Sequence, residues 1–326
     1  MDTLPLALLS SKGGCFGFPE QYEEIVKQHF QIVYLNEFMS NKNKYSQKIQ
    51  AIIVWLHFPV VDKETLDSLP NLKVIGSSGA GVDHLDLKLI SSYGIPVTNT
   101  PHLGDDATAD MAMTLMMASA KQIMEVHRIT CASETKEIDI NWVTDDITEA
   151  TLGIIGMGSI GYSIAMRAKA FRMKILYRNR NRRLPEEEAA VGAVYCSKIE
   201  DLLQQADFLI LVVNLNPETH MLIGKRELQL MKPTATLINV SRGKVVDQDA
   251  LVEALKNGTI KAAALDVTYP EPLPRDHPLL SMKNVIVTPH MASGTDRTRR
   301  RIAEKLILNA SSILKGLPVK DIVTVP

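Results

Sequence analysis

Short runs of apolar residues alternate along the chain with longer stretches in which apolar residues recur every three or four positions. This alternation is typical of α/β folds, in which helices connect the strands of a largely parallel sheet. In the first hundred residues the runs that predict strands are Leu6–Leu9, Ile32–Leu35, Ala51–Trp55, Val74–Ser77 and Pro96–Asn99. The stretches Pro19–His29 and Lys63–Leu69 predict helices between them. Residues 1–100 are therefore expected to form one doubly wound unit.

A second series of the same kind occupies the rest of the chain. It is preceded by one long predicted helix, Thr108–Arg128, and by a polar stretch, 131–150, that has no clear periodicity and predicts a loop. The predicted strands of this series are Leu152–Ile155, Lys174–Tyr177, Phe208–Val213, Ala235–Val240, Ala262–Leu265 and Val285–Val287. A basic amphipathic helix is predicted for Thr295–Leu314.

Composition narrows the functional class. A length of 326 residues suits two domains, and a formal net charge of -1 gives no general attraction to nucleic acid. No apolar run reaches the roughly 18 residues that span a bilayer, and the N-terminus lacks the basic start of a signal peptide. Three distant cysteines, Cys15, Cys131 and Cys196, fit a reducing compartment better than a disulfide framework or a metal site. A cytoplasmic protein without a metal is therefore expected.

The strongest local motif is the glycine-rich segment Gly156-Met157-Gly158-Ser159-Ile160-Gly161. It follows a predicted strand and precedes a predicted helix, which is the context that a dinucleotide-binding turn requires. The first glycine permits a tight turn, the second lets the backbone approach a diphosphate, and the third allows close packing of helix on strand. The free N–H groups of the helix start would bind the diphosphate.

The residues after the next strand predict which nicotinamide cofactor is used. NAD sites usually place an acidic residue about 20 positions after the glycines, where it binds the ribose hydroxyls. Here the strand is followed by Arg178-Asn179-Arg180-Asn181-Arg182-Arg183, and no carboxylate occurs before Glu186. Guanidinium groups match a 2′-phosphate, so NADPH is the preferred cofactor and NAD a possible one. The alternative is a solvated basic loop.

Three residues just beyond predicted strands suit the reduction of a 2-keto acid. They are Arg242, Glu271 and His290. In open α/β sheets ligands bind outside the carboxyl ends of the strands, so all three can lie beside the cofactor. Arginine binds a keto acid by paired hydrogen bonds, histidine exchanges a proton near neutral pH, and glutamate orients that histidine. Taken singly, each residue also has an ordinary structural interpretation.

The order of these motifs resembles that of the D-isomer-specific 2-hydroxyacid dehydrogenase family, and within it the glyoxylate/hydroxypyruvate reductases. The resemblance covers nearly the whole chain and includes Gly79–Leu85, Ile238–Gly243, Ala264–Val267, Pro270–Pro272 and Thr288–His290. It implies that a Rossmann-type cofactor domain, residues 101–291, is inserted into a flavodoxin-like substrate domain, residues 1–100 and 292–326. It also implies a homodimer.

The resemblance implies roles for individual residues. Arg242 would bind the substrate carboxylate and carbonyl, His290 would be the acid/base, and Glu271 would pair with His290. The implied substrate-binding residues are Ala80, Gly81, Arg242, His290 and Ser293, with the carboxylate held by the backbone amides of the first two. The implied cofactor-binding residues are Thr108, Gly156, Gly158, Ser159, Ile160, Gly161, Arg178, Asn179, Arg180, Arg183, Asn214, Val240, Asp266 and Ala292. Among them, Asp266 would contact the nicotinamide amide and Arg180 the 2′-phosphate.

The sequence departs from the family pattern at a few positions. Ala292 stands where glycine is common, Asp110 replaces a usual glutamate, and 131–150 matches poorly. The substrate is therefore left open among glyoxylate, hydroxypyruvate and a longer acid of the 2-ketogluconate type, and Trp55–Phe58 is a candidate lining of the pocket. A cofactor-sensing binding protein of the same fold and a formate dehydrogenase are the competing classes. The arginines after Tyr177 argue against the first, and a paired Glu271 and His290 argue against the second.

Overall fold

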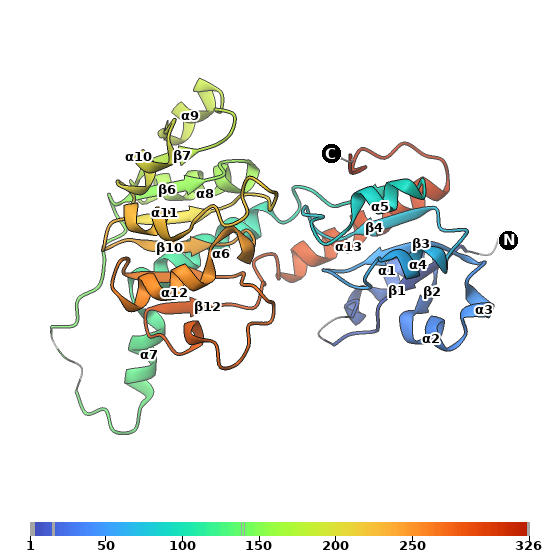
Figure 1. The fold of residues 1–326 in the computed structure, drawn as a ribbon, viewed down its shortest axis with the longest axis horizontal. Helices are drawn as coiled ribbons and strands as arrows, with labels where there is room; N and C mark the ends of the chain where they lie inside the picture. The colour runs from blue at the N-terminus through green and yellow to red at the C-terminus, as the bar shows by residue number, and fades with distance from the viewer. Residues whose placement is uncertain (1–3, 15–16, 138, 140, 325–326) are drawn as a thin grey trace. The chain divides into compact units, whose positions relative to one another are not determined.

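The computed structural model describes residues 4–14, 17–137, 139 and 141–324, so Cys15 lies outside the described residues. The chain divides into two compact units (Figure 1). The first unit comprises Met1–Gly104 and Gly294–Pro326, and the second comprises Asp105–Ser293. The chain therefore leaves the first unit once and returns to it for its last helix.

The first unit is built on a five-stranded parallel sheet with the strand order β2-β1-β3-β4-β5. The strands are β1 (Leu6–Leu9), β2 (Gln31–Tyr34), β3 (Ile49–Val54), β4 (Val74–Ser77) and β5 (Val97–Thr98). The helices are α1 (Glu23–Lys27), α2 (Leu35–Ser40), α3 (Lys42–Tyr45), α4 (Lys63–Asp67), α5 (Leu87–Ser92) and α13 (Asp296–Leu314), with a 3₁₀ turn at Glu20–Tyr22. One face of the sheet packs against Val26 of α1 and Leu306 of α13, and the other against Leu66 of α4 and Ile90 of α5.

The second unit is built on a seven-stranded parallel sheet with the order β12-β11-β10-β9-β6-β7-β8. Its strands are β6 (Thr151–Ile155), β7 (Lys174–Arg178), β8 (Ala193–Tyr195), β9 (Phe208–Leu211), β10 (Thr236–Asn239), β11 (Ala262–Leu265) and β12 (Val285–Val287). Its helices are α6 (Asp105–Ala120), α7 (Ile123–Cys131), α8 (Ser159–Ala170), α9 (Pro185–Val191), α10 (Ile199–Leu203), α11 (Lys225–Leu230) and α12 (Gln248–Lys256), with short 3₁₀ turns at Gly243–Val245 and Pro278–Leu280. The strand order reverses direction between β6 and β9, and this switch point is where such sheets bind ligands. The prediction of two parallel α/β units is confirmed.

The single helix predicted for Thr108–Arg128 is wrong. The chain forms two helices, α6 and α7, because Gln122 adopts a left-handed conformation with φ 49°. The segment after α7 returns to this break, where the backbone N–H of Asp145 donates to Ala120 O at 3.0 Å and Lys121 Nζ donates to Asp145 O at 2.7 Å. No glycine or proline marks the break, so tertiary contacts and not local propensity end α6. The short edge strand β8 is also absent from the prediction.

No helix within the described part of the chain is long and apolar enough to cross a membrane.

Candidate active site

The predicted chemical residues of the second unit follow the carboxyl ends of its strands. The glycine-rich turn follows β6, the arginines follow β7, and Asn214 follows β9. Val240 and Arg242 follow β10, Asp266 and Glu271 follow β11, and His290, Ala292 and Ser293 follow β12. Because all seven strands are parallel, these loops share one edge of the sheet. Thr108 lies within α6, which packs against β10 and β11.

The three glycines of the turn after β6 differ in what surrounds them. A Cβ on Gly156, whose φ is +98°, would lie 2.2 Å from Val212 O, and a Cβ on Gly161 would lie 2.5 Å from Gly156 O. A Cβ on Gly158 would have no neighbour within 4 Å. Gly156 and Gly161 therefore allow close backbone packing, and the surface at Gly158, the N-cap of α8, is open. An open, glycine-lined helix start fits a bound diphosphate, as the dinucleotide-binding motif requires.

The end of β7 is attached to the glycine-rich turn through Asn179 and Arg183. Asn179 Oδ1 accepts from the N–H of Met157 at 2.5 Å, and its Nδ2 donates to Met157 O at 3.0 Å. Arg183 donates to Met157 O at 2.9 Å and to Glu187 at 2.6 Å, with its guanidinium 4.6 Å from the ring centre of Tyr162. Both side chains therefore shape the turn, in addition to any contact with a cofactor.

The arginines after β7 are not equivalent. Arg178 donates to Tyr195 and to the backbone carbonyl of Asn179, and Arg182 makes two hydrogen bonds of 2.8 Å with the carboxylate of Glu188. Arg182 and the hydroxyl of Tyr177 lower the pKa of Glu188 to about 2. Arg180 differs, because its side chain is 79% exposed and its ion pair with the exposed Glu218 is long, at 3.7 Å. Arg180 is thus the most exposed guanidinium of this loop.

His290 and Glu271 form a hydrogen-bonded pair. His290 Nδ1 lies 2.8 Å from Glu271 Oε2, and the two side chains are 32% and 30% exposed. A carboxylate only accepts, so Nδ1 carries the hydrogen of this bond. The other carboxylate oxygen, Oε1, accepts from the backbone N–H of Thr268 at 3.0 Å. Glu271 is thus fixed by its own loop while it orients the imidazole.

Asp266 holds the loop that carries His290. It is buried, and its Oδ1 accepts from Thr288 Oγ1 at 2.6 Å and from Met291 N at 3.0 Å, while Oδ2 accepts from Ala292 N at 2.8 Å. Its backbone carbonyl accepts from His290 N at 2.7 Å. His290 has a φ of 50°, a costly conformation for a residue with a side chain, and these bonds maintain it. The hydrogen bonds of Asp266 to this loop were not foreseen from the sequence, where only a nicotinamide contact was predicted.

Gly243 brings the Arg242 segment against the loop of Glu271. A Cβ at Gly243 would lie 2.1 Å from the carbonyl carbon and oxygen of Thr268. The Arg242 backbone is held in turn by Asn239, whose Nδ2 donates to Arg242 O at 2.9 Å. The half-buried Arg242 therefore occupies a segment fixed on both sides, next to the loop that positions His290.

In the first unit, Ala80 and Gly81 lie in the loop after β4. The Ala80 carbonyl accepts from Asn99 Nδ2 at 2.8 Å. The backbone N–H of Gly79 donates to Thr100 Oγ1 at 2.7 Å, and the backbone N–H of Thr100 donates to Gly79 O at 2.9 Å. The loop is thus held by the residues that follow β5.

The comparisons with known proteins place the chain in a family. Residues 113–292 match the model described as D-isomer specific 2-hydroxyacid dehydrogenase, NAD binding domain. A glyoxylate reductase of Thermococcus gammatolerans is 39% identical over 306 residues, which are 91% of each chain. A glyoxylate/hydroxypyruvate reductase B of Enterobacter sp. is 41% identical over 81% of each chain. The chain belongs to the D-isomer-specific 2-hydroxyacid dehydrogenase family.

A solved structure of the same family has the same fold. The crystal structure of a glyoxylate reductase from Paecilomyes thermophila superposes with a TM-score of 0.80 at 30% identity, over 98% of each chain. This D-2-hydroxyacid dehydrogenase is therefore an NAD(P)-dependent oxidoreductase, and the turn at Gly156–Gly161 lies in its NAD-binding domain.

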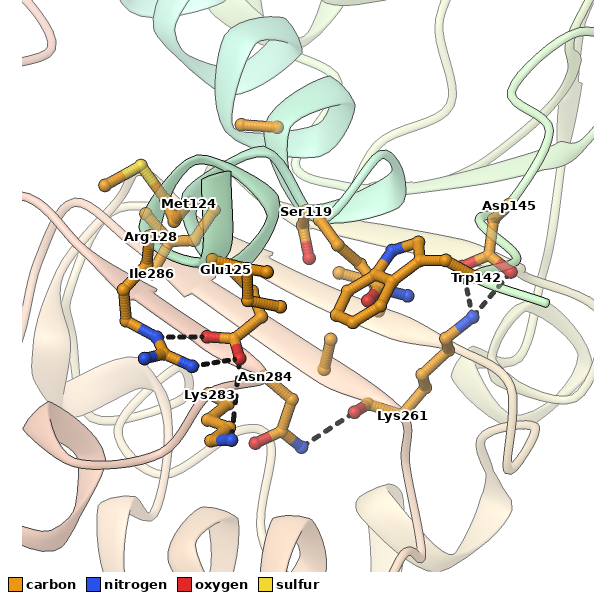
Figure 2. Close-up of a pocket in the computed structure, with 15 residues that line it drawn as sticks. Ser119, Met124, Glu125, Arg128, Trp142, Asp145, Lys261, Lys283, Asn284 and Ile286 are labelled. Carbon is orange, nitrogen blue, oxygen red and sulfur yellow. Dashed lines mark hydrogen bonds and ion pairs between the residues drawn. The ribbon is translucent and has the colours of Figure 1, made fainter. Parts of the chain in front are cut away.

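The dehydrogenase also has a cavity that no motif predicted. It has a volume of about 390 Å³ and lies at the amino ends of β10, β11 and β12 (Figure 2). His290 follows the carboxyl end of β12, at the opposite edge of the sheet. Its wall includes Trp142, and beside it Lys261 Nζ lies 2.6 Å from both carboxylate oxygens of Asp145. Across the cavity Glu125 pairs with Arg128 and Lys283, and Arg128 lowers the pKa of Glu125. The stretch 131–150 has no periodic pattern, so nothing in the sequence indicated that it contributes to this cavity.

Proposed function

We propose that this dehydrogenase reduces a small 2-keto acid, glyoxylate or hydroxypyruvate, to the D-2-hydroxy acid at the expense of NADPH, with His290 as the proton donor. The observation that carries the proposal is the 2.8 Å hydrogen bond between His290 Nδ1 and Glu271 Oε2, beside the loop that carries Arg242. The names of the relatives support the same substrates.

The cofactor, when bound, supplies the hydride that is added to the C2 carbon of the keto acid. The carbonyl oxygen then acquires negative charge and takes the proton from His290 Nε2, so the C=O double bond becomes CH–OH. Glu271 keeps Nε2 directed away from itself, since it occupies Nδ1. His290 afterwards recovers its proton from solvent, and one proton is consumed in each reduction.

Substrate binding is assigned to Arg242, Ser293 and the loop after β4. Arg242 has the fixed planar donor geometry that a carboxylate and an adjacent carbonyl require. The same charge stabilises the oxygen as it becomes negative, which is the larger contribution to rate. In the first unit the backbone amides of Ala80 and Gly81 are assigned to the substrate carboxylate.

Preference for NADPH is assigned mainly to Arg180. Arg178, Arg182 and Arg183 have close partners within the protein, whereas Arg180 pairs at 3.7 Å with the exposed Glu218. Arg180→Ser should raise KM for NADPH about tenfold or more and leave KM for NADH nearly unchanged, because NADH has no 2′-phosphate. Arg182→Ser is the matched control, since its guanidinium is paired with Glu188. Equal weakening of both cofactors would remove Arg180 from this role.

A homodimer is part of the proposal. Helix α7 has no buried residue, and the apolar side chains of Ile123, Met124 and Val143 are exposed. Met124 also lines the cavity of Figure 2. A second copy would cover such a surface. Light scattering coupled to size exclusion should give twice the mass of 36.1 kDa. Met124→Glu on the same surface should reduce that mass.

A cytoplasmic location is also proposed. Cys131 is exposed and Cys196 is buried, and both are free thiols. An exposed thiol is typical of a reducing compartment. Cell fractionation with a cytosolic marker tests this.

The experiment that tests the reaction follows NADPH absorbance with glyoxylate and hydroxypyruvate, and identifies the product by chiral chromatography. Turnover of either acid to the D-product is expected. Absence of turnover with both acids, in protein that binds NADPH, would contradict the proposed function.

A further inference from the structure

The turn that follows β3 holds a costly conformation. Trp55 N donates to Phe58 O at 2.8 Å and Phe58 N donates to Trp55 O at 3.2 Å, so Leu56 and His57 are the two central residues of a tight turn. Leu56 has a φ of 58°, where glycine or asparagine is normally found. The backbone N–H of Leu56 is held by the hydroxyl of the buried Ser78 at 2.8 Å. Strained backbone conformations tend to cluster at functional sites.

This turn places His57 against a second imidazole. The ring centres of His57 and His84 lie 5.0 Å apart, with the ring planes inclined by 45°. His84 Nε2 in turn lies 3.1 Å from the hydroxyl of Ser77, which is fully buried at the end of β4. Ser77 therefore fixes His84, His84 supports His57, and His57 is the exposed member of the pair.

The two histidines belong to the same loop cluster as the proposed carboxylate site. Ala80 and Gly81 lie between Ser78, which holds the turn of His57, and His84, which packs against its ring. A 2-keto acid bound by its carboxylate at Ala80 and Gly81 has its C3 carbon only two bonds from the carboxylate carbon, and the C3 substituent one bond beyond. The nearest polar side chains of this loop cluster then determine which substituent on C3 the site accepts.

We propose that His57 forms a hydrogen bond with a hydroxyl group on C3 of the substrate and that His84 positions it, so that the enzyme selects 3-hydroxylated 2-keto acids. The inference rests on the proposed function and adds a substrate class to it. An imidazole donates through one nitrogen and accepts through the other, as a hydroxyl also donates and accepts, and an aliphatic substituent satisfies neither. A site built to bind a hydroxyl discriminates strongly against the analogue that lacks it.

Hydroxypyruvate and pyruvate differ only in the C3 hydroxyl, and glyoxylate has no C3. The test measures kcat/KM for all three acids with wild type, His57→Phe and His57→Gln. Wild type should prefer hydroxypyruvate to pyruvate. His57→Phe keeps a ring against His84 but loses the hydrogen bond, so this preference should fall about tenfold, mainly through KM. His57→Gln retains a donor and an acceptor and should restore part of it. Ser77→Ala, which frees His84, should lower the preference by a smaller factor.

His127→Phe, a histidine on α7 of the second unit, is the matched control and should leave the hydroxypyruvate-to-pyruvate ratio unchanged. Loss of rate with all three acids in equal proportion for His57→Phe would mean that His57 only supports the fold, and would overturn the inference. An unchanged ratio, with glyoxylate still reduced, would overturn it as well and leave the proposed function standing. Absence of glyoxylate and hydroxypyruvate turnover in wild type would instead defeat the proposed function. Calorimetry of D-glycerate and D-lactate binding gives a second readout, in which His57→Phe should weaken D-glycerate alone.

Discussion

Gly243 and Thr268 are in direct backbone contact, so that a single methyl group at residue 243 would lie 2.1 Å from the Thr268 carbonyl. The contact joins the segment of Arg242 to the loop in which Thr268 N donates to Glu271. Gly243→Ala must separate the two loops. We expect a loss of about 1 to 3 kcal/mol in the free energy of unfolding, together with reduced kcat/KM. Thermal denaturation and steady-state kinetics measure both, and unchanged values would show that the loops move apart without cost.

Gly158→Ala should leave stability unchanged and weaken cofactor binding. No atom lies within 4 Å of the position of its Cβ, so the protein itself should fold with nearly unchanged melting temperature. The added methyl group would occupy the space assigned to the cofactor diphosphate, and the Kd for NADPH should rise at least about tenfold. Fluorescence titration with NADPH measures this. Tight NADPH binding by the variant would mean that the cofactor diphosphate does not bind at Gly158.

Arg242→Lys keeps the charge but loses the paired donors. We expect a loss of about 2 to 4 kcal/mol of transition-state stabilisation, on the scale of removing one donor to a developing oxyanion. The measurement is kcat/KM with the best keto acid, and Arg275→Lys, an exposed position, is the control. If the two variants have the same kcat/KM, Arg242 does not contact the substrate.

His290→Ala should lower kcat/KM in both directions by about 10²- to 10⁴-fold, because the same imidazole gives the proton in reduction and takes it in oxidation. Glu271→Gln retains an acceptor for Nδ1 and so keeps the ring oriented, and its loss should be smaller. Rates measured with keto acid and with hydroxy acid check both directions. If His290→Ala keeps full activity in either direction, another group donates and accepts the proton.

Glu188 should make the stability of the cofactor domain depend on pH. Arg182 and Tyr177 lower the pKa of Glu188 to about 2 in the folded state, against an ordinary value of about 4.3 when unfolded. A lowered folded pKa stabilises the protein above the unfolded pKa, and this stabilisation is lost as pH falls toward the folded pKa. Urea midpoints of wild type should therefore exceed those of Glu188→Gln at pH 7, and the difference should shrink between about pH 5 and about pH 2. Glu186→Gln, an exposed position on the same helix, is the control. A difference that stays constant with pH would contradict the assignment.

Much of the second unit was predictable because its signals are local. The glycine-rich turn follows a strand and opens a helix, and glycine spacing alone predicted the different surroundings of Gly156, Gly158 and Gly161. The pairing of Glu271 with His290 came from family resemblance, since the two residues lie in different loops and no spacing rule joins them. The hydrogen bonds from Thr288, Met291 and Ala292 to Asp266 connect separate strands of the sheet, and sequence patterns do not indicate such contacts.

Other features escaped prediction because tertiary contacts decide them. The apolar pattern continues through Gln122, where the chain nevertheless ends α6, and the contact of Asp145 with Ala120 supplies the reason. The strand β8 is only three residues long and lies at the sheet edge, too short to give a pattern. Arg180 could not be distinguished from its neighbours until their partners were seen.

The path of the chain also determines the order in which the protein can fold on the ribosome. The five strands of the first unit are synthesised early, but the α13 side chains that cover one of their faces, among them Ile302, Leu306 and Ala310, come after the entire second unit. The fit is close, for a Cβ on Gly76 would lie 2.9 Å from Leu306 Cδ1. The seven-stranded unit can therefore be complete while the first sheet still exposes an apolar face, which is the kind of surface that chaperones bind. The unit whose synthesis begins first is thus the last to have all of its chain available for folding.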